Sequence, residues 1–299
     1  MEECDTGRFP GVARPVEEDS RGILRPAPGL ERFRLSRRVP SSPVARFVDR
    51  YWIAEWDLDE PYVQEILSHP VVNIVFEAAG ATVSGVTTAR TAKELTGRGR
   101  AVGVMFRPAG FHPFLGASLS TLTDRSVALT ELFPSADILE GAVPILDVDV
   151  AVRRLDEFLQ GRVPAERGTS EDVSDLVEEV AGDRSIRRVD DLAERQGVSV
   201  RQLQRWFAEY VGVGPKWVIR RYRLYEAAEA TAKGEAVDWS EVAAALGYSD
   251  QAHLTRDFTA AVGIPPDRYA RENRQETLPP SLHVPASDDG SASTPTRSK

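Results

Sequence analysis

The chain has 299 residues, long enough for two domains that each bury their own core. Its 41% hydrophobic and 28% charged residues are ordinary for a globular protein, and no apolar run reaches the length of about 18 residues that a membrane helix needs. The N-terminus lacks the apolar core of a secretory signal, and the single cysteine, Cys4, excludes an intrachain disulfide or a zinc cage. These features predict a cytoplasmic protein without a membrane partner.

The net charge of −9 is unevenly distributed along the chain. Residues 183–275 contain 15 Lys and Arg against 14 Asp and Glu, whereas the rest of the chain contains 22 against 32. A nucleic-acid partner is attracted by local rather than total charge. The acidity of the whole chain is therefore compatible with DNA binding by residues 183–275.

Both ends of the chain are predicted to be disordered, over residues 1–32 and 276–299. They are rich in Pro, Gly, Ser and charged residues and show no apolar periodicity. Between them, residues 33–160 are predicted to form a β-rich sensor or dimerisation domain.

Three short runs in the first half of the chain have the character of strands, at residues 71–77, 80–86 and 101–108. Each is rich in β-branched or aromatic residues and is bounded by Gly, Pro or polar residues. Several short strands of this kind are typical of a small sandwich or barrel.

Two helices are predicted to follow these strands. In residues 147–159 and again in 173–180, apolar residues recur at intervals of three and four. The apolar stripe from Val148 to Leu159 is interpreted as packing on its own domain, with a dimer interface as the alternative. Residues 161–182 are predicted to be a linker and a connecting helix, because residues 161–168 combine Gly, Pro and charges.

Residues 183–275 are predicted to form an all-helical domain with an internal repeat. Five identical pairs of residues are separated by the same interval of 51 positions. The pairs are Leu203 and Leu254, Arg205 and Arg256, Phe207 and Phe258, Gly212 and Gly263, and Pro215 and Pro266. A register held through five residue types indicates a duplicated structural unit.

Each repeat has the pattern of a helix-turn-helix unit. In the first repeat a short apolar helix precedes Gly197, Ser199 caps the next helix, and the stripe from Leu203 to Tyr210 forms its buried face. In the second repeat Asp238 and Glu241 have the spacing of a capping box. Gly247 makes the turn there, and Ser249 or Asp250 begins the following helix.

Polar side chains are predicted on the outer face of the second helix of each unit. They are Arg201, Gln204 and Arg205 in the first unit, and Gln251, Ala252, His253 and Arg256 in the second. Arg can donate two hydrogen bonds to guanine, Gln can pair with adenine, and a small side chain can pack on the methyl group of thymine. A helix over residues 216–232 is predicted to join the units, so that both can enter the major groove about 34 Å apart.

At these residues the sequence resembles the AraC family of bacterial transcription regulators. The run LGYSDQAHLTRDF at 246–258, followed by VGIPP at 262–266, is similar to the family signature, and residues 192–207 resemble its first unit. The resemblance implies that the seven outer residues contact double-stranded DNA in the major groove. Ala252 departs from the family, in which a longer polar side chain is common there.

The resemblance extends more weakly to the N-terminal region. Residues 69–77, 103–116 and 122–133 are similar to the sensor domain found in such regulators, which implies a β-rich, cupin-like module. The predicted fold class is therefore α+β, with this domain preceding an all-α DNA-binding domain. The predicted function is sequence-specific regulation of transcription in response to a small molecule or partner. RNA polymerase and a second copy of the chain are further expected partners.

Other interpretations compete with this one. His69 and His112 are weak metal ligands because no third ligand has suitable spacing, so neither a metal nor a cofactor is predicted. Five aromatic residues can line a ligand pocket but are more typical of a core: Trp52, Trp56, Phe76, Phe106 and Phe111. Arg220, Arg221 and Arg223 are interpreted as a solvated face rather than as phosphate contacts. An enzyme tethered to DNA lacks a catalytic cluster, while a regulator without an effector stays open as an alternative.

Overall fold

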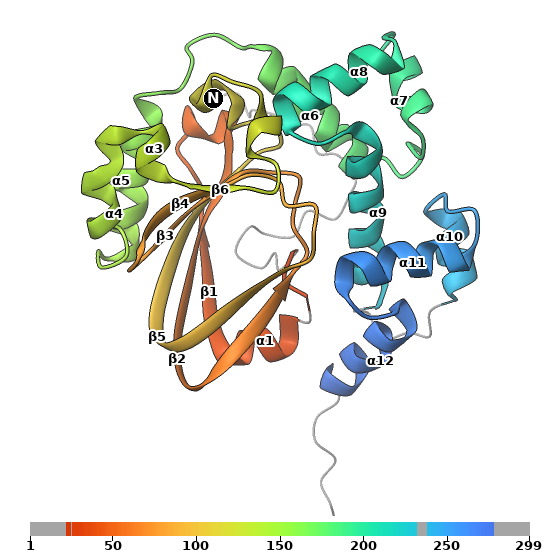
Figure 1. Cartoon of the computed structure of the whole chain (residues 1–299), viewed down its shortest axis with the longest axis horizontal. Coiled ribbons are helices and arrows are strands. Elements are labelled where there is room, and N and C mark those ends of the chain that lie inside the picture. The colour runs from red at the N-terminus through yellow and green to blue at the C-terminus, as the bar shows by residue number, and fades with distance from the viewer. Residues whose placement is uncertain (1–21, 25, 232–237, 278–299) are drawn as a thin grey trace, which may run out of the picture.

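The computed structural model describes residues 22–24, 26–231 and 238–277. Of the predicted disordered tails 1–32 and 276–299, residues 1–21 and 278–299 lie outside these residues, whereas residues 276 and 277 are helical. Figure 1 shows a sheet with helices on one flank and a second group of helices, α6 to α12, beside it. An antiparallel β domain followed by a helical region confirms the predicted α+β class.

Six strands of the N-terminal domain form one antiparallel sheet in the order β1-β2-β5-β3-β4-β6. The strands are β1 (Phe33–Arg38), β2 (Val48–Ile66), β3 (Asn73–Glu77), β4 (Gly80–Ser84), β5 (Thr91–Phe106) and β6 (Ser126–Ala128). Within the described residues this is a single sheet, with β1 and β6 at its edges, rather than two packed sheets. The long strands β2 and β5 curve across the whole domain (Figure 1).

The predicted strands are present, but the three runs missed β1, β2 and β6 entirely and the first half of β5. The three predicted runs correspond to β3, β4 and the last part of β5. The outer halves of β2 and β5 are mostly exposed, so they lack the apolar alternation that marks a half-buried strand. The two strands pair with each other over a long stretch, from Trp52 opposite Gly103 to Ile66 opposite Thr91.

One face of the sheet carries the apolar core of this domain. Phe76, Phe106 and Phe111 are each about 1% exposed or less and pack with Tyr51 and Ile53, which confirms the core interpretation for these three phenylalanines. Short helices and one long helix cover this core. They are α2 (His112–Leu115), α3 (Leu129–Leu132), α4 (Asp137–Ala142), α5 (Val148–Gln160), and the 3-10 turns η2 (Val44–Arg46), η3 (Leu119–Leu122) and η4 (Pro134–Ala136).

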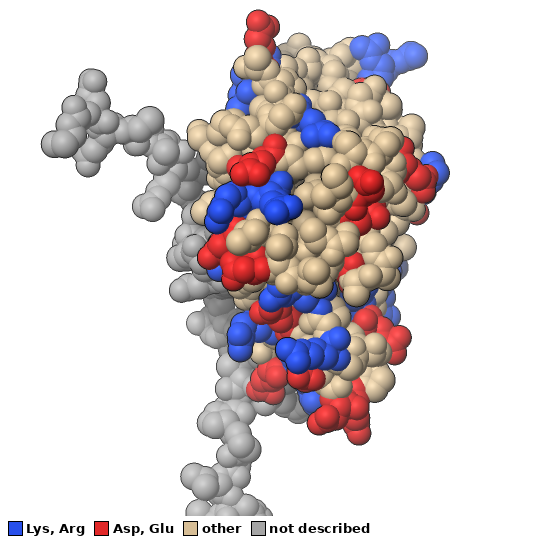
Figure 2. All heavy atoms as spheres, turned by 90° about the vertical axis from the view of Figure 1, so that its left-hand side faces the viewer, with Lys and Arg blue, Asp and Glu red and all other residues tan. Residues whose placement is uncertain are grey.

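Helix α5 packs on its own domain, as the sequence predicts. Ala151, Leu155 and Leu159 are buried in the sheet core, and Asp147 caps the helix by accepting from the backbone N–H of Asp149 at 3.0 Å. The side of the molecule on which α3, α4 and α5 lie faces the viewer in Figure 2, and acidic and basic side chains are interspersed on it. Leu155 and Leu159 of the predicted stripe are therefore used within the domain, whereas Val148 and Val152 are half-buried.

The indole rings of Trp52 and Trp56 lie on the sheet beside glycines of the neighbouring strand. Trp52 is paired with Gly103 and Trp56 with Gly99. A Cβ at Gly103 would lie 1.9 Å from Trp52 Cε2, and one at Gly99 would lie 2.3 Å from Trp56 Cζ2. Each glycine thus leaves the space that the ring across the strand occupies.

Part of the segment predicted to be a disordered tail is structured. Ile23 forms a β-bridge with Ile66, Leu24 is buried, and α1 spans Pro26–Arg32. Leu24 donates its backbone N–H to Glu65 O at 3.1 Å and packs in a core shared with the C-terminal helices. These long-range contacts have no local periodicity, which is why composition alone assigned residues 22–32 to the tail.

The C-terminal region consists of α6 (Thr169–Gly182), α7 (Val189–Arg195), α8 (Val200–Trp206), the π-helical segment η5 (Phe207–Val211), α9 (Pro215–Thr231), α10 (Trp239–Ala245), α11 (Gln251–Val262) and α12 (Pro266–Thr277). Helix α9 runs between two helix-turn-helix units (Figure 1). It matches the helix predicted over residues 216–232. Residue 232 itself lies outside the described residues.

Two apolar cores hold this region together, and each includes residues of the sheet domain. The first joins α6, α7, α8 and the beginning of α9 with Val86 and Ala109. The second joins the end of α9 and helices α10 to α12 with Leu24 and Leu67. Because α6 packs in the first core, we propose that the C-terminal domain begins near residue 169 rather than 183.

Among the described residues, no helix has the length and apolar character needed to cross a membrane.

Candidate DNA interface

The two helix-turn-helix units are built in the same way. Gly197 and Gly247, with φ of +62° and +77°, make the turns, as predicted. Ser199 caps α8 by accepting from Gln202 N at 3.2 Å, and Asp250 caps α11 by accepting from His253 N at 2.7 Å. Leu203 and Leu254 are both fully buried. The N-caps are therefore related by the same 51-residue interval as the buried residues.

The structure places the predicted DNA-contacting residues along α8 and in the first half of α11. Six of the seven are exposed, and His253 is half-buried. They are Arg201, Gln204 and Arg205 on α8, and Gln251, Ala252, His253 and Arg256 on α11. The structure brings each set together on one helix and leaves the two sets on separate units.

The predicted DNA-contacting side chains on α8 differ in whether they already form a hydrogen bond within the protein. Arg205 donates from Nη2 to Gln202 Oε1 at 2.6 Å. Arg201 and Gln204 make no hydrogen bond or ion pair with other described residues. These two side chains are thus free to bond with an external partner without breaking a contact.

On α11 the polar side chains are held near the turn. Gln251 Oε1 accepts from Ser240 Oγ at 3.1 Å, and His253 Nδ1 lies 3.2 Å from Ser249 Oγ. The positive charge of Arg256 contributes to a lowered pKa of Asp250, although the bond from His253 N is the larger cause. Ala252 is exposed and offers only a methyl group.

Helix α8 ends differently from its counterpart. It continues as the π-helical segment η5, in which Gly212 N–H bonds to Phe207 O at 2.9 Å, whereas α11 stays α-helical to Val262. Both segments stop at a glycine with φ of +94°, Gly212 and Gly263.

The sheet domain contacts η5 directly through residues 112–123. Thr123 Oγ1 donates to Gly212 O at 2.6 Å, and Ser118 Oγ donates to Ala208 O at 3.2 Å. His112 Nε2 lies 3.0 Å from Glu209 Oε1. We call this contact the α8 clamp. Sequence patterns do not reveal this contact, because the residues involved are polar and about 90 positions apart.

The basic run on α9 is not a solvated face, contrary to the interpretation from sequence. Arg221 and Arg223 are buried, and only Arg220 is exposed. Arg221 stacks over Trp217 with Cζ 4.5 Å from the ring centre, donates to Thr88 O at 3.3 Å, and has its pKa lowered by burial. Arg220 bonds from Nε to Asp257 at 2.7 Å.

Both histidines considered as metal ligands lie between the two domains. His69 stacks on Tyr225 with ring centres 4.4 Å apart, and His112 packs against Tyr210 at 4.3 Å. No group of three His, Cys, Asp or Glu side chains within residues 22–24, 26–231 and 238–277 is placed to hold a metal ion.

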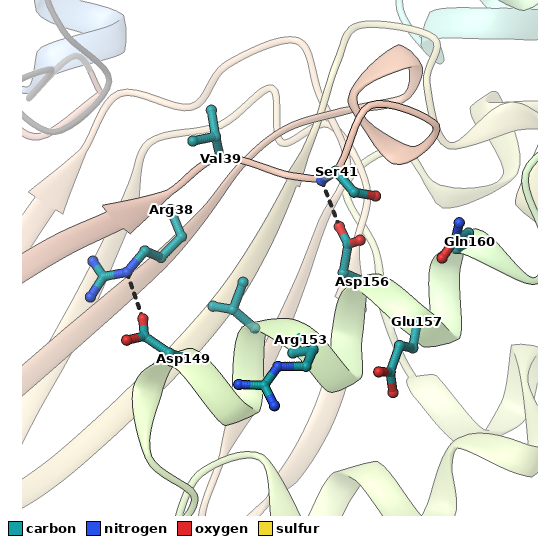
Figure 3. Close-up of a pocket in the computed structure, with 9 residues that line it drawn as sticks. Arg38, Val39, Ser41, Asp149, Arg153, Asp156, Glu157 and Gln160 are labelled. Atoms are coloured by element: carbon teal, nitrogen blue, oxygen red, sulfur yellow. Dashed lines mark hydrogen bonds and ion pairs between the residues drawn. The ribbon is translucent and has the colours of Figure 1, made fainter.

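A shallow groove of about 450 Å³ lies between α5 and the end of β1. Its edge is formed by Arg38 bound to Asp149 at 2.9 Å, and by Asp156, which accepts from Ser41 N at 3.0 Å (Figure 3). Asp156 also accepts from Tyr51, and burial is the main cause of the raised pKa of that tyrosine. The groove combines both charge signs, so it favours no single ligand chemistry.

Comparison with protein families identifies two regions. A family model described as a helix-turn-helix domain matches residues 192–272, which include α8, α9 and α11. A second model, described as a domain of unknown function, matches residues 36–128 of the sheet domain. No curated protein matches the chain.

Solved structures similar to the chain include ToxT from Vibrio cholerae, with 12% identity, coverage of 73% of this chain and 95% of that chain, and a TM-score of 0.36. An AraC-type regulator from Chromobacterium violaceum is 28% identical, over 36% of this chain and 89% of that chain, with a TM-score of 0.28. The C-terminal domain of AraT, a response regulator from Geobacillus stearothermophilus, is 24% identical, over 33% and 84%, with a TM-score of 0.31. TM-scores below 0.5 do not establish a shared overall arrangement.

The assignment rests on the helix-turn-helix match and on the construction of the two units. The match spans the duplicated units and the helix that joins them. Residues 192–272 thus form a helix-turn-helix domain of AraC type, which supports a DNA-binding transcription regulator, and residues 36–128 form an N-terminal domain of unknown function.

Proposed function

We propose that the protein regulates transcription by reading a specific DNA site with the first turns of α8 and α11. The supporting observation is the presentation of two sets of exposed Arg, Gln and small side chains on equivalent helices. Arg201 and Arg205 would bond to guanine edges and Gln204 or Gln251 to adenine, while Ala252 would pack on a thymine methyl group.

The connecting helix sets the distance between the two reading helices. Helix α9 has 17 residues and is therefore roughly 25 Å long. A rigid connection of this length suits two contacts in successive turns of the major groove, whose centres are about 34 Å apart. The proposed DNA site therefore has two short blocks separated by about 10 base pairs.

Chemical protection of guanine N7 tests this arrangement. On a bound site, methylation by dimethyl sulfate should be blocked in two clusters about 10 base pairs apart. Arg256→Ala should expose one cluster, and Arg201→Ala should expose the other. Protection of one cluster by the wild-type protein, unaffected by either substitution, would contradict the proposal.

We further infer that the sheet domain controls the first unit through the α8 clamp. The clamp binds η5, which directly continues the helix that carries Arg201, Gln204 and Arg205. A small molecule or partner that moves residues 112–123 would change the position of α8. This inference supports an effector-responsive regulator over one whose N-terminal domain has no sensing role.

Thermal unfolding of the full chain in the presence of a library of small molecules tests the sensing role. A compound that raises the unfolding temperature and also changes DNA affinity would support it. Compounds that stabilise the protein without changing DNA affinity would favour the regulator without an effector. RNA polymerase and a second copy of the chain are the other proposed partners, to be tested by transcription in vitro and by light scattering.

A further inference from the structure

A basic cleft lies between the two helix-turn-helix units. Its volume is about 330 Å³, and it is lined by the start of α7 with the residues before it, by α9, and by the turn that precedes α11. Its lining contains one carboxylate, Asp190. The basic side chains in the lining are Arg187, Arg188, Lys216, Arg220, Arg223 and His253. We call it the interunit cleft.

Three of these cations already have an acidic partner. The pairs are Arg220 with Asp257, Arg223 with Glu226 at 2.5 Å, and Arg188 with Asp190 at 3.8 Å. Arg187 and Lys216 are exposed and have no hydrogen bond or ion pair with other described residues. The cleft therefore holds two positive charges, one just before α7 and one on the first turn of α9, that no described side chain neutralises.

The side chain of Arg187 is held in place by the second unit. A Cβ built at Gly247 would lie 2.7 to 3.0 Å from the Cβ, Cγ and Cδ atoms of Arg187, so its aliphatic stem lies directly on this glycine. The guanidinium of the first unit is thus positioned by the turn of the second. Lys216 reaches the same cleft from the first turn of α9.

The cleft opens beside the proposed reading surface. His253, on the first turn of α11, is part of its lining. Helices α7 and α10 lie on the side of the molecule away from the sheet, and α8 and α11 run from them toward the sheet (Figure 1). The beginnings of both reading helices therefore lie on the same side as the start of α7, which lines the cleft.

We propose that the interunit cleft binds one phosphate group of the DNA backbone, between the two stretches of major groove that α8 and α11 read. This inference rests on the proposed function. Unpaired Arg and Lys side chains are the usual ligands of DNA phosphates, and such contacts fix the register of a protein without reading bases. Arg187 supplies a two-pronged donor and Lys216 a second positive charge. The contact sets how the two units are placed along the site.

Salt dependence of binding tests the proposal. Arg187→Gln/Lys216→Gln should weaken binding of the full chain to its selected site roughly tenfold. It should also lower the slope of log K against log salt by about 1, while the preferred base sequence stays the same. Arg187→Lys/Lys216→Arg, which keeps both charges, should retain the wild-type slope. Thermal unfolding checks that each variant is folded.

A matched control removes the same charge elsewhere. Arg34→Gln/Arg98→Gln changes two exposed arginines of the sheet domain and should leave the slope unchanged. If the cleft variant behaves like this control while the wild type binds its site, the cleft proposal is overturned and the proposed function stands. If the wild type selects no site at all, the proposed function fails instead.

Inorganic phosphate distinguishes a DNA phosphate from a free phosphate ligand. The DNA assignment predicts that millimolar phosphate changes the unfolding temperature of the wild type and of Arg187→Gln/Lys216→Gln equally. Stabilisation of the wild type alone, together with an unchanged salt slope for DNA, would overturn the assignment to DNA.

Discussion

Arg223 is 1% exposed, and its guanidinium group bonds to the end of α6 and the loop that follows it. It donates to Asp183 O at 2.8 Å and to Ile186 O at 2.9 Å, and pairs with Glu226. The sequence could not distinguish it from its exposed neighbour Arg220, because a basic run carries no periodicity that reveals burial. The carbonyl groups that it satisfies are about 40 residues away.

We predict that Arg223→Leu lowers the free energy of unfolding by roughly 3–5 kcal/mol, because it removes the buried ion pair with Glu226 and takes the guanidinium donor away from the carbonyl groups of Asp183 and Ile186. Arg220→Leu is the control. Its side chain is 44% exposed, so loss of its pair with Asp257 should cost less than about 1 kcal/mol. Urea unfolding measures both, and similar losses would contradict the structural role of Arg223.

Gly103 is required by the ring of Trp52 across the strand. We predict that Gly103→Ala costs about 1–3 kcal/mol of stability, because the added methyl group forces the indole out of place. Gly97→Ala is the comparison. A Cβ added at Gly97 would have no neighbour within 4 Å, but the φ of this glycine is +54°, so the substitution reports backbone strain alone. Trp52→Leu should reduce the cost of Gly103→Ala; equal costs in both backgrounds would be evidence against this contact.

The exposed faces of the reading helices were the most predictable part of the candidate site. Helical periodicity places Arg201 and Arg205 opposite the buried Leu203, and the structure has all three in those environments. Whether each contacts DNA stays a prediction. The unpaired state of Arg187 and Lys216 was not predictable, since it depends on which acidic side chains lie nearby in the folded protein.

At the scale of elements, the repeat predicted two similar helices, and the structure shows one difference between them. The segment η5 is π-helical where the equivalent part of α11 is α-helical. The sequence repeat contains Phe, Gly and Pro at matching positions in both, so it gives no reason for the difference. The contacts with the sheet domain also differ: the α8 clamp bonds to η5, whereas the second unit meets the side chain of Arg90 at Gly263.

Asp250 gives α11 a stability that depends on pH. Its pKa is lowered, first by the bond from His253 N–H, so the charged cap is complete at neutral pH and is lost as pH falls below the ordinary Asp value of about 4. We predict that Asp250→Ala lowers the unfolding temperature at pH 7 and that this difference shrinks on acidification. Asp250→Asn, which still caps, should lose little at pH 7. A difference independent of pH would be inconsistent with the cap.

Thr123 contributes one side-chain hydrogen bond to the α8 clamp, from its Oγ1 to Gly212 O. We predict that Thr123→Val costs about 1 kcal/mol of stability, because Gly212 O loses its side-chain donor. Amide exchange in residues 207–212 should become faster, while exchange in residues 258–262 stays the same. Unchanged exchange in both segments would show that the clamp does not hold η5.

At the scale of the whole molecule, the sequence predicted two kinds of domain in the correct order. It did not predict that each helical core contains residues of the sheet domain, such as Val86 in one and Leu67 in the other. These contacts join distant parts of the chain, and local patterns carry no information on them. The same contacts hold the N-terminal domain against both helical cores.

The most direct test of this account is selection of bound DNA from a randomised duplex library by the full chain, with Arg205→Ala/Arg256→Ala in parallel. The account predicts a motif of two short blocks about 10 base pairs apart that the double variant no longer selects. A motif that the double variant retains unchanged would contradict base reading by α8 and α11. Recovery of no motif at low salt would contradict sequence-specific binding itself.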